Sequence, residues 1–194
     1  MKRSIITVTT ILLALLFVSS TTASAQRTSR GQFLFSGDVS TFMFESIGGE
    51  ITVGRYMKYS YWNAGVLNEN PWVPINGTGE KAMFARYEAM GSFMYRIIPT
   101  HTRVFNVYGG GEVFVGGEVL DPYAQLTEET YRTLLNSGYR TARFIYGGAI
   151  RLELEVFPFR SWAIYVPIRA SLTANTAING MFGGSVGLGI RFNY

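Results

Sequence analysis

The stretch that decides the fold is the end of the chain, Phe182-Gly183-Gly184-Ser185-Val186-Gly187-Leu188-Gly189-Ile190-Arg191-Phe192-Asn193-Tyr194. Apart from Gly184, its even positions are apolar or aromatic, and its odd positions are small or polar. Strict alternation predicts a β-strand with one oily face and one small or polar face. A strand of this composition that ends on an aromatic residue is typical of an outer-membrane β-barrel, where the last strand closes the cylinder against the first.

The spacing of three residues in this stretch resembles the terminal signal that the barrel-assembly machinery reads in barrels generally. These residues are Gly189, Phe192 and Tyr194. The resemblance implies that they form the assembly signal and that the assembly machinery is a partner of the protein.

Residues 1–25 predict a cleaved secretory signal peptide. Lys2 and Arg3 form its positive end, and residues 11–18 are an apolar run too short to span a bilayer. Ala23-Ser24-Ala25 is a small-x-small site, so we expect cleavage between Ala25 and Gln26. The alternative is an uncleaved N-terminal anchor. Cleavage leaves residues 26–194 as a single domain, which we expect in the outer membrane of a Gram-negative bacterium.

Composition excludes several classes of protein. Removing Lys2 and Arg3 leaves 15 of the 17 basic residues against 13 acidic ones, so the net charge of +4 falls to +2. The remaining basic residues are scattered, so we expect no direct nucleic-acid binding. The chain has no cysteine, which excludes disulfides and a lipidated cysteine anchor. No run of 18 apolar residues follows residue 25, so a membrane location requires a closed barrel, with outer-membrane lipid around it.

Alternation predicts an all-β fold, a small antiparallel transmembrane β-barrel of eight strands. Six strands are clear after residue 49, at 50–61, 83–97, 105–119, 144–156, 162–172 and 182–194. Single-chain bacterial barrels usually have an even number of strands, at least eight. Residues 31–47 must then supply two short strands, divided near Gly37-Asp38. In the third clear strand, glycines 109–111, 116 and 117 predict bending or a bulge, and Pro167 is tolerable only near an edge or a bulge.

The connections are unequal in length. Short joints near 47–49, 99–102 and 157–160 are predicted on the periplasmic side, and long ones at about 67–79 and 121–141 outside. The second long loop contains Thr127-Glu128-Glu129-Thr130-Tyr131-Arg132-Thr133-Leu134-Leu135, which predicts a short helix capped by Thr127.

The polar face of the strands carries charges of both signs, which predicts a charge network in the barrel lumen. Its members are Arg86, Glu88, Glu112, Glu118, Arg151, Glu153, Glu155, Arg169 and Arg191. The alternative is a catalytic carboxylate pair, Glu153 and Glu155, for acid–base chemistry. Because side chains just fill an eight-stranded barrel, the network is favoured and an open pore is not expected.

Other chemistry has little support in the sequence. The only histidine, His101, lies in a predicted turn, and because the chain has one histidine and no cysteine, we expect no metal site. Gly109-Gly110-Gly111 lies within a strand and lacks the Lys-Ser/Thr of a phosphate-binding loop. We therefore expect no catalytic residue, no cofactor and no enzyme activity.

Two segments carry a family resemblance, Phe144-Ile145-Tyr146-Gly147-Gly148-Ala149-Ile150-Arg151-Leu152-Glu153-Leu154-Glu155 and residues 184–194. Together with the secretory start and Gly31-Gln32, they resemble the TraO family, conjugal transfer proteins of Bacteroidetes conjugative transposons. The resemblance implies a structural, non-catalytic outer-membrane component of a conjugative DNA-transfer apparatus, a type IV secretion-like system, with other conjugation subunits as partners. The alternative is a free-standing small barrel with a surface-binding or small-solute transport role.

Overall fold

The structure is a computed structural model that describes residues 31–42, 46–74, 81–98, 105–120, 127–128, 131–132, 142–158, 161–176 and 182–194. All structural statements below concern these residues. Within them, none of the helical segments has the length and apolar character that a membrane-spanning helix needs. The predicted cleavage site, Ala25 and Gln26, lies outside the described residues, and so does His101.

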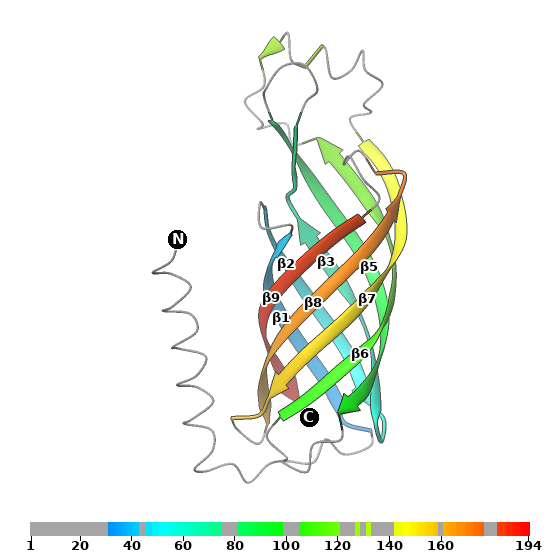
Figure 1. Cartoon of the computed structure of the whole chain (residues 1–194), viewed down its shortest axis with the longest axis vertical. Helices are drawn as coiled ribbons and strands as arrows, with labels where there is room; N and C mark the ends of the chain where they lie inside the picture. Colours follow the sequence, from blue (N-terminus) through cyan, green and yellow to red (C-terminus); the bar gives the residue numbers. More distant parts are fainter. Residues whose placement is uncertain are drawn as a thin grey trace.

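Eight antiparallel strands form a closed barrel, which confirms the predicted fold class (Figure 1). They are β1 (Phe33–Phe42), β2 (Ser46–Tyr56), β3 (Ser60–Glu69), β5 (Lys81–Ile98), β6 (Phe105–Leu120), β7 (Ala142–Val156), β8 (Trp162–Ala174) and β9 (Phe182–Asn193). Each strand pairs with the next, and β3 pairs directly with β5. A short additional strand, β4 (Trp72–Pro74), pairs with the start of β5.

The last strand closes the barrel against the first, as the terminal alternation predicted. The β1–β9 register runs from Leu34 opposite Asn193 to Phe42 opposite Ser185. At the end of this seam, the N–H groups of Phe33 and Tyr194 each donate to the other residue's carbonyl at 3.0 Å. Closure pairs the strand edges, which is the condition for a sheet to cross a bilayer.

Two of the predicted strand boundaries were wrong, and the errors cancelled in the count. Residues 33–42 form one continuous strand, so there is no break at Gly37-Asp38. Residues 50–61 are not one strand, because β2 ends at Tyr56 and β3 begins at Ser60. The Met57 N–H donates to the Ser60 carbonyl at 2.7 Å and closes a turn there. Across this three-residue turn the inward positions change from even-numbered residues on β2 to odd-numbered residues on β3. Tyr61 therefore lies in the lumen and not among the outward-facing apolar residues.

The turn also corrects the predicted connections. The joint predicted at 47–49 lies inside β2. The short connection predicted there is instead formed by residues 57–59, between β2 and β3. The long segment proposed to begin at residue 67 begins after Glu69 and contains β4. Of the predicted helix at 127–135, the described Glu128, Tyr131 and Arg132 have helical backbone, and the Tyr131 N–H donates to the Thr127 carbonyl at 2.9 Å.

The glycines of β6 and Pro167 of β8 do not mark the bulges that the sequence suggested. The β5–β6 register shift lies between Arg96 and Ile98, not at the β6 glycines. An added Cβ at Gly116 would lie 1.9 Å from the Tyr87 carbonyl oxygen, so the close approach of β5 requires glycine there. Pro167 pairs with Glu153 of β7, and on its other side the β8–β9 register is the same before and after it. The β8–β9 ladder omits two successive pairs there, Val166 opposite Leu188 and Pro167 opposite Gly187, because proline has no N–H to donate.

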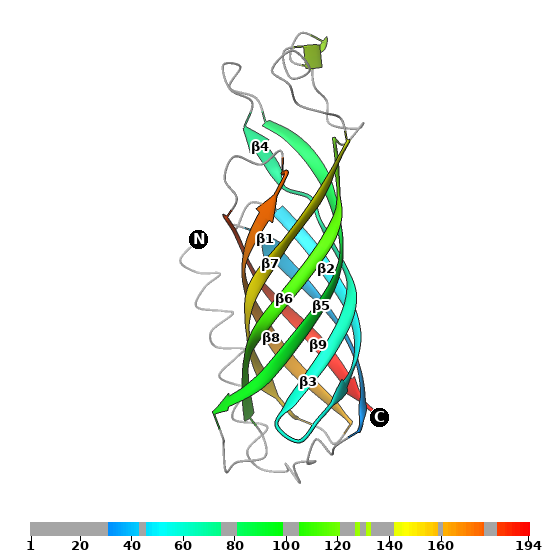
Figure 2. The ribbon, with the colours of Figure 1, turned by 90° about the vertical axis from the view of Figure 1, so that its right-hand side faces the viewer.

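The barrel wall is higher on one side. Strands β5, β6 and β7 have 18, 16 and 15 residues, whereas β1, β2 and β3 have 10, 11 and 10. Beyond the last β3–β5 pair, Glu69 opposite Arg86, β5 continues with residues 81–85, and Trp72 of β4 pairs there with Met83. Figure 2 shows β4 at the raised end, opposite the C-terminus. We call these two ends the β4 end and the C-terminal end.

The outer surface has the composition of a lipid-facing belt. Exposed aromatic residues gather near the C-terminal end, namely Phe33, Phe35, Tyr59, Trp62, Phe93, Tyr95, Phe192 and Tyr194. A second set, Trp72, Tyr87, Phe144, Tyr146 and Phe182, lies toward the β4 end. Exposed aliphatic residues such as Val39, Ile51, Val66 and Leu188 lie between the two sets. An apolar band between aromatic girdles is the surface of a transmembrane barrel.

A charge placed in the middle of this belt is expected to destabilise the protein more than a charge at its edge. Val39, which is 64% exposed in mid-strand, and Ile47, which is 71% exposed at the β4 end of β2, form a matched pair. We expect Val39→Arg to cost about 2–4 kcal/mol and Ile47→Arg about 0–1 kcal/mol of folding free energy in lipid vesicles. Urea titration of the refolded variants measures both values, and equal losses would contradict the lipid-belt assignment.

Candidate functional site

The nine charged residues predicted in the lumen are all buried there and form one continuous chain of ion pairs. In order from the β4 end, the chain is Glu118, Arg86, Glu88, Arg169, Glu112, Arg151, Glu153, Arg191 and Glu155. Successive nitrogen–oxygen distances are 3.9, 2.5, 2.6, 2.8, 3.3, 2.8, 2.8 and 2.9 Å. Acid and base alternate without interruption, so each guanidinium lies between two carboxylates.

Strand alternation places these side chains. On β7, the residues of the inward row are buried, so Arg151, Glu153 and Glu155 project into the lumen at successive inward positions. Strands β5 and β6 contribute even-numbered residues, and β8 and β9 contribute Arg169 and Arg191 from their odd-numbered faces. Five neighbouring strands therefore carry the whole chain.

Arg151 is the most connected member of the chain. Its guanidinium lies 2.8 Å from Glu50, 2.8 Å from Glu153, 3.3 Å from Glu112 and 3.9 Å from Asp38. Because its side chain is only 1% exposed, water screens these contacts little. One buried cation thus holds together carboxylates from four strands.

Three carboxylates of this interior were not in the predicted network. Asp38 and Glu50 contact Arg151, and Glu69 lies 3.9 Å from Arg169. The sequence predicts a break between strands at Asp38 and a loop at Glu69. The signal that finds Asp38 is present in the sequence, because Ser36, Asp38 and Ser40 are polar and alternate with Phe35, Gly37 and Val39, which are not.

The interior is acid-rich. Among the residues that the structure describes, the buried set contains eight carboxyl groups and four guanidinium groups. The carboxyl groups belong to Asp38, Glu50, Glu69, Glu88, Glu112, Glu118, Glu153 and Glu155, and the guanidinium groups to Arg86, Arg151, Arg169 and Arg191. The network is therefore not a set of isolated one-to-one pairs, and each arginine serves several acids.

Buried tyrosines complete the network toward the C-terminal end. The Tyr56 hydroxyl donates to Glu155 at 3.0 Å, the Tyr165 hydroxyl donates to Asp38 at 2.8 Å, and the Tyr61 hydroxyl donates to Glu153. The Arg191 guanidinium lies 4.7 Å from the ring centroid of Tyr61 and 4.5 Å from that of Tyr165. Arg191 is thus held by cation–π contacts as well as by two carboxylates.

Apolar clusters lie against the chain of ion pairs at two levels. One consists of Leu34, Tyr56, Tyr61, Met94 and Tyr108. The other consists of Leu67, Met90 and Phe114, and the Phe114 ring lies 4.8 Å from the Arg169 guanidinium and 5.7 Å from that of Arg86. Side chains thus occupy the lumen at both levels, as expected for eight strands.

Glu153 and Glu155, the carboxylate pair of the catalytic alternative, lie deep in the network. Glu153 and Glu155 are both 0% exposed, and each is engaged by Arg191 and by a tyrosine hydroxyl. A general acid or base must reach the proton it transfers, and these two groups reach only their neighbours. Within the described part of the chain, no cluster of three or more acidic or histidine side chains could hold a metal ion.

The three residues assigned to the assembly signal have different surroundings. Phe192 and Tyr194 are exposed at the C-terminal end, 40% and 80% respectively. Gly189 faces inward, and an added Cβ would lie 2.6 Å from the Tyr165 ring. Gly189 therefore has a packing role of its own, and recognition of the three residues by the assembly machinery stays a prediction.

The closed sheet, the polar lumen and the apolar belt define a class, the small β-barrel of outer-membrane type. Two of the solved structures that share this fold illustrate the class. Neisserial surface protein A matches with a TM-score of 0.56 at 10% identity, over 84% of this chain and 95% of its own. Ail, the attachment invasion locus protein of Yersinia pestis, in complex with sucrose octasulfate, matches with a TM-score of 0.53 at 11% identity, over 86% and 100%. Identities this low establish the fold alone.

The sequence identifies the family. Residues 29–194, most of the chain, match the family described as conjugative transposon protein TraO, and the chain belongs to this family. The resemblance seen at residues 144–155 and 184–194 is thereby confirmed. Among curated proteins, no sequence matches significantly.

Proposed function

We propose that this protein is a structural, non-catalytic outer-membrane component of a conjugative DNA-transfer apparatus, a type IV secretion-like system of Bacteroidetes. The observation that carries the proposal is the combination of TraO family membership with a closed barrel whose outer surface is a lipid belt. A cleaved signal peptide at residues 1–25 would bring the chain to the outer membrane of the Gram-negative cell. Its partners would be outer-membrane lipid, the barrel-assembly machinery and other conjugation subunits.

The lengths of the connections support an orientation with the C-terminal end in the periplasm. At that end the strands are joined by residues 57–59, 99–104 and 157–161. At the β4 end, residues 70–80, which include β4, and residues 121–141 form the long connections. Short periplasmic turns and longer extracellular loops are the usual asymmetry of such barrels. The raised wall of β5, β6 and β7 then projects outside the membrane.

The filled lumen supports a structural role. A chain of ion pairs and two apolar clusters occupy the barrel interior, so the barrel by itself offers no conduit for DNA. The carboxylates are engaged by arginine and tyrosine and are not open to a substrate. The protein would therefore act through its rim and loops on other subunits, without catalysis and without a cofactor.

Deletion of the gene from a donor strain tests this proposal. We expect the transfer frequency of the conjugative element to fall to the detection limit and to be restored by the wild-type gene in trans. Unchanged transfer, with the barrel present in the outer-membrane fraction of the parent strain, would contradict the conjugation role. That result would favour a free-standing barrel with a surface-binding or small-solute transport role.

A further inference from the structure

The outer surface of the barrel contains a hollow of about 840 Å³ that extends from β1 to β7. Two rows of outward-facing residues bound it. The row nearer the β4 end is Gly49, Asn68, Tyr87, Gly117 and Phe144, which pair in this order across β2, β3, β5, β6 and β7. The row nearer the C-terminal end is Ile51, Val66, Ala89 and Val115.

The hollow opens toward the membrane, not into the lumen. Its bounding residues Ile51, Val66, Tyr87, Val115 and Phe144 are 50–61% exposed. The residues between the two rows, Asp38, Glu50, Leu67, Glu88 and Gly116, are paired neighbours in the sheet, and the four with large side chains are buried on the inner side. Their backbone therefore forms the floor of the hollow, between the two rows. Four strand spacings of about 4.8 Å make the groove about 19 Å long.

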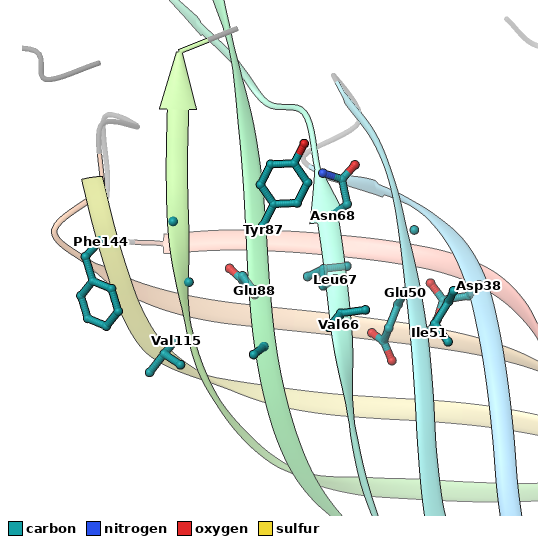
Figure 3. A pocket seen from close by; sticks show the side chains of 14 residues that line it. Asp38, Glu50, Ile51, Val66, Leu67, Asn68, Tyr87, Glu88, Val115 and Phe144 are labelled. Atoms are coloured by element: carbon teal, nitrogen blue, oxygen red, sulfur yellow. The ribbon is translucent and has the colours of Figure 1, made fainter. Parts of the chain in front are cut away.

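The two sides of the hollow differ in polarity. The row nearer the C-terminal end is purely aliphatic. The row nearer the β4 end carries the Tyr87 hydroxyl and the amide of Asn68, which lie side by side as a register pair with their polar ends toward the β4 end (Figure 3). Asn68 is held in place by a hydrogen bond that its Nδ2 donates to the Arg86 carbonyl at 3.3 Å. An occupant must therefore be apolar along its length and polar on the side that faces the β4 end.

A membrane lipid in the leaflet at the β4 end has this polarity and this direction. Its linkage region lies at the depth of an aromatic girdle, where Tyr87 and Phe144 are, and its acyl chains lie below. Gly117 and Gly49 leave gaps in the upper row that a chain can enter. We propose that the hollow is a binding site for one acyl chain of an outer-leaflet lipid, with the lipid's carbonyl or hydroxyl groups at Tyr87 and Asn68. The proposal rests on the membrane location and orientation given above.

Filling the groove tests the proposal. Gly117 and Gly184 both face outward, and a Cβ at each would be in ordinary contact, 3.5 Å from the Arg143 carbonyl and 3.7 Å from the Arg169 carbonyl respectively. Only Gly117 lines the hollow, so Gly117→Leu fills it and Gly184→Leu is a matched control on β9. The mature protein, purified in mild detergent, would be mixed with phosphatidylethanolamine or with lipid A in separate arms. Native mass spectrometry would then count bound lipid.

We expect the wild type and Gly184→Leu to carry one lipid, and Gly117→Leu to lose about tenfold in binding, the effect of about two methylene groups leaving an apolar surface. An adduct with lipid A that Gly117→Leu weakens supports the proposal, because lipid A is the outer-leaflet lipid of a Gram-negative outer membrane. An adduct with phosphatidylethanolamine alone, an inner-leaflet lipid, would overturn it. Equal retention of lipid by all three proteins, or no one-to-one adduct in either arm, would overturn it. If the wild type forms a dimer without bound lipid, and Gly117→Leu is monomeric, the occupant of the hollow is a second copy of the chain and the proposal is overturned.

Each variant must be shown to fold before its lipid binding is compared. Migration of unheated and boiled samples in detergent gels shows whether each variant is folded. If Gly117→Leu does not fold, Ala89→Phe places a large ring on the other side of the same groove and takes its place in the comparison. The experiment uses purified protein, so failure of the lipid site is distinguishable from failure of the conjugation role, which the donor deletion measures.

Discussion

Replacing Arg151 by methionine is expected to lower the free energy of unfolding by about 3–5 kcal/mol, because breaking a buried ion pair leaves uncompensated buried charge. Arg151 contacts Asp38, Glu50, Glu112 and Glu153 within 3.9 Å, and methionine supplies none of these contacts. The four carboxylates would then repel one another in an interior that already has more acid than base. The loss is measured as the shift of the urea midpoint for refolding into lipid vesicles.

The matched control is an arginine of the same chain in an exposed ion pair. Arg132 lies 2.7 Å from Glu128, and the two side chains are 73% and 79% exposed. Exposed pairs of this spacing contribute about 0.3–0.5 kcal/mol, so Arg132→Met should hardly move the midpoint. Arg151→Lys keeps the charge but not the planar fork, and we expect an intermediate loss. A shift for Arg151→Met no larger than that for Arg132→Met would show that the network does not stabilise the barrel.

Replacing Gly189 by leucine is expected to prevent the barrel from closing. An added Cβ would lie 2.6 Å from Cε1 and Cζ of Tyr165 and 2.6 Å from Cβ of Asp38. The Tyr165 ring cannot move aside freely, because its hydroxyl donates to Asp38 and its ring lies against Arg191. Overpacking by smaller groups already costs about 1–3 kcal/mol, so a whole leucine side chain should abolish the heat-modifiable folded form in detergent gels.

Graded variants separate packing from recognition at Gly189. Gly189→Ala should still fold with a lowered urea midpoint, and combining it with Tyr165→Leu should remove most of the added cost, since contacting residues couple in a double-mutant cycle. Gly184→Leu, at an outward position on the same strand, is the control. A Gly189 variant that fails in cells but refolds normally into vesicles would contradict the packing account. Such a result would support recognition of Gly189 by the assembly machinery.

The buried network has a structural logic that follows from the environment of the barrel. A barrel in lipid presents apolar residues outward, so the alternating inward residues are the ones that can be polar. Charged groups removed from water must be paired, and a closed lumen supplies partners from strands that are far apart in sequence. The contact between Arg151 and Glu50, for example, joins residues 101 positions apart. Such contacts oppose slippage of one strand against the next, since a shift by one residue would turn the charges outward.

The sequence by itself determined which side chains face inward. Residues 182–194 alternate so regularly that the final strand, its oily face and the inward position of Arg191 follow from the period of a strand, which is a local property. The same rule placed Glu153 and Glu155 on one face with Arg151. It failed at residues 57–59, because apolar Met57, Tyr59 and Tyr61 keep the parity of β2 across a turn that alternation cannot show.

Only the tertiary structure decided which acids meet which bases. Asp38, Glu50 and Glu69 lie on β1, β2 and β3, whereas their partners Arg151 and Arg169 lie on β7 and β8, across the lumen. Contacts across a barrel depend on the closure and stagger of all the strands together, and no local period encodes them. The position of Gly189 beneath Tyr165 is of the same kind, since it depends on the β8–β9 register. Alternation thus assigns the face of each residue, and closure assigns its neighbours.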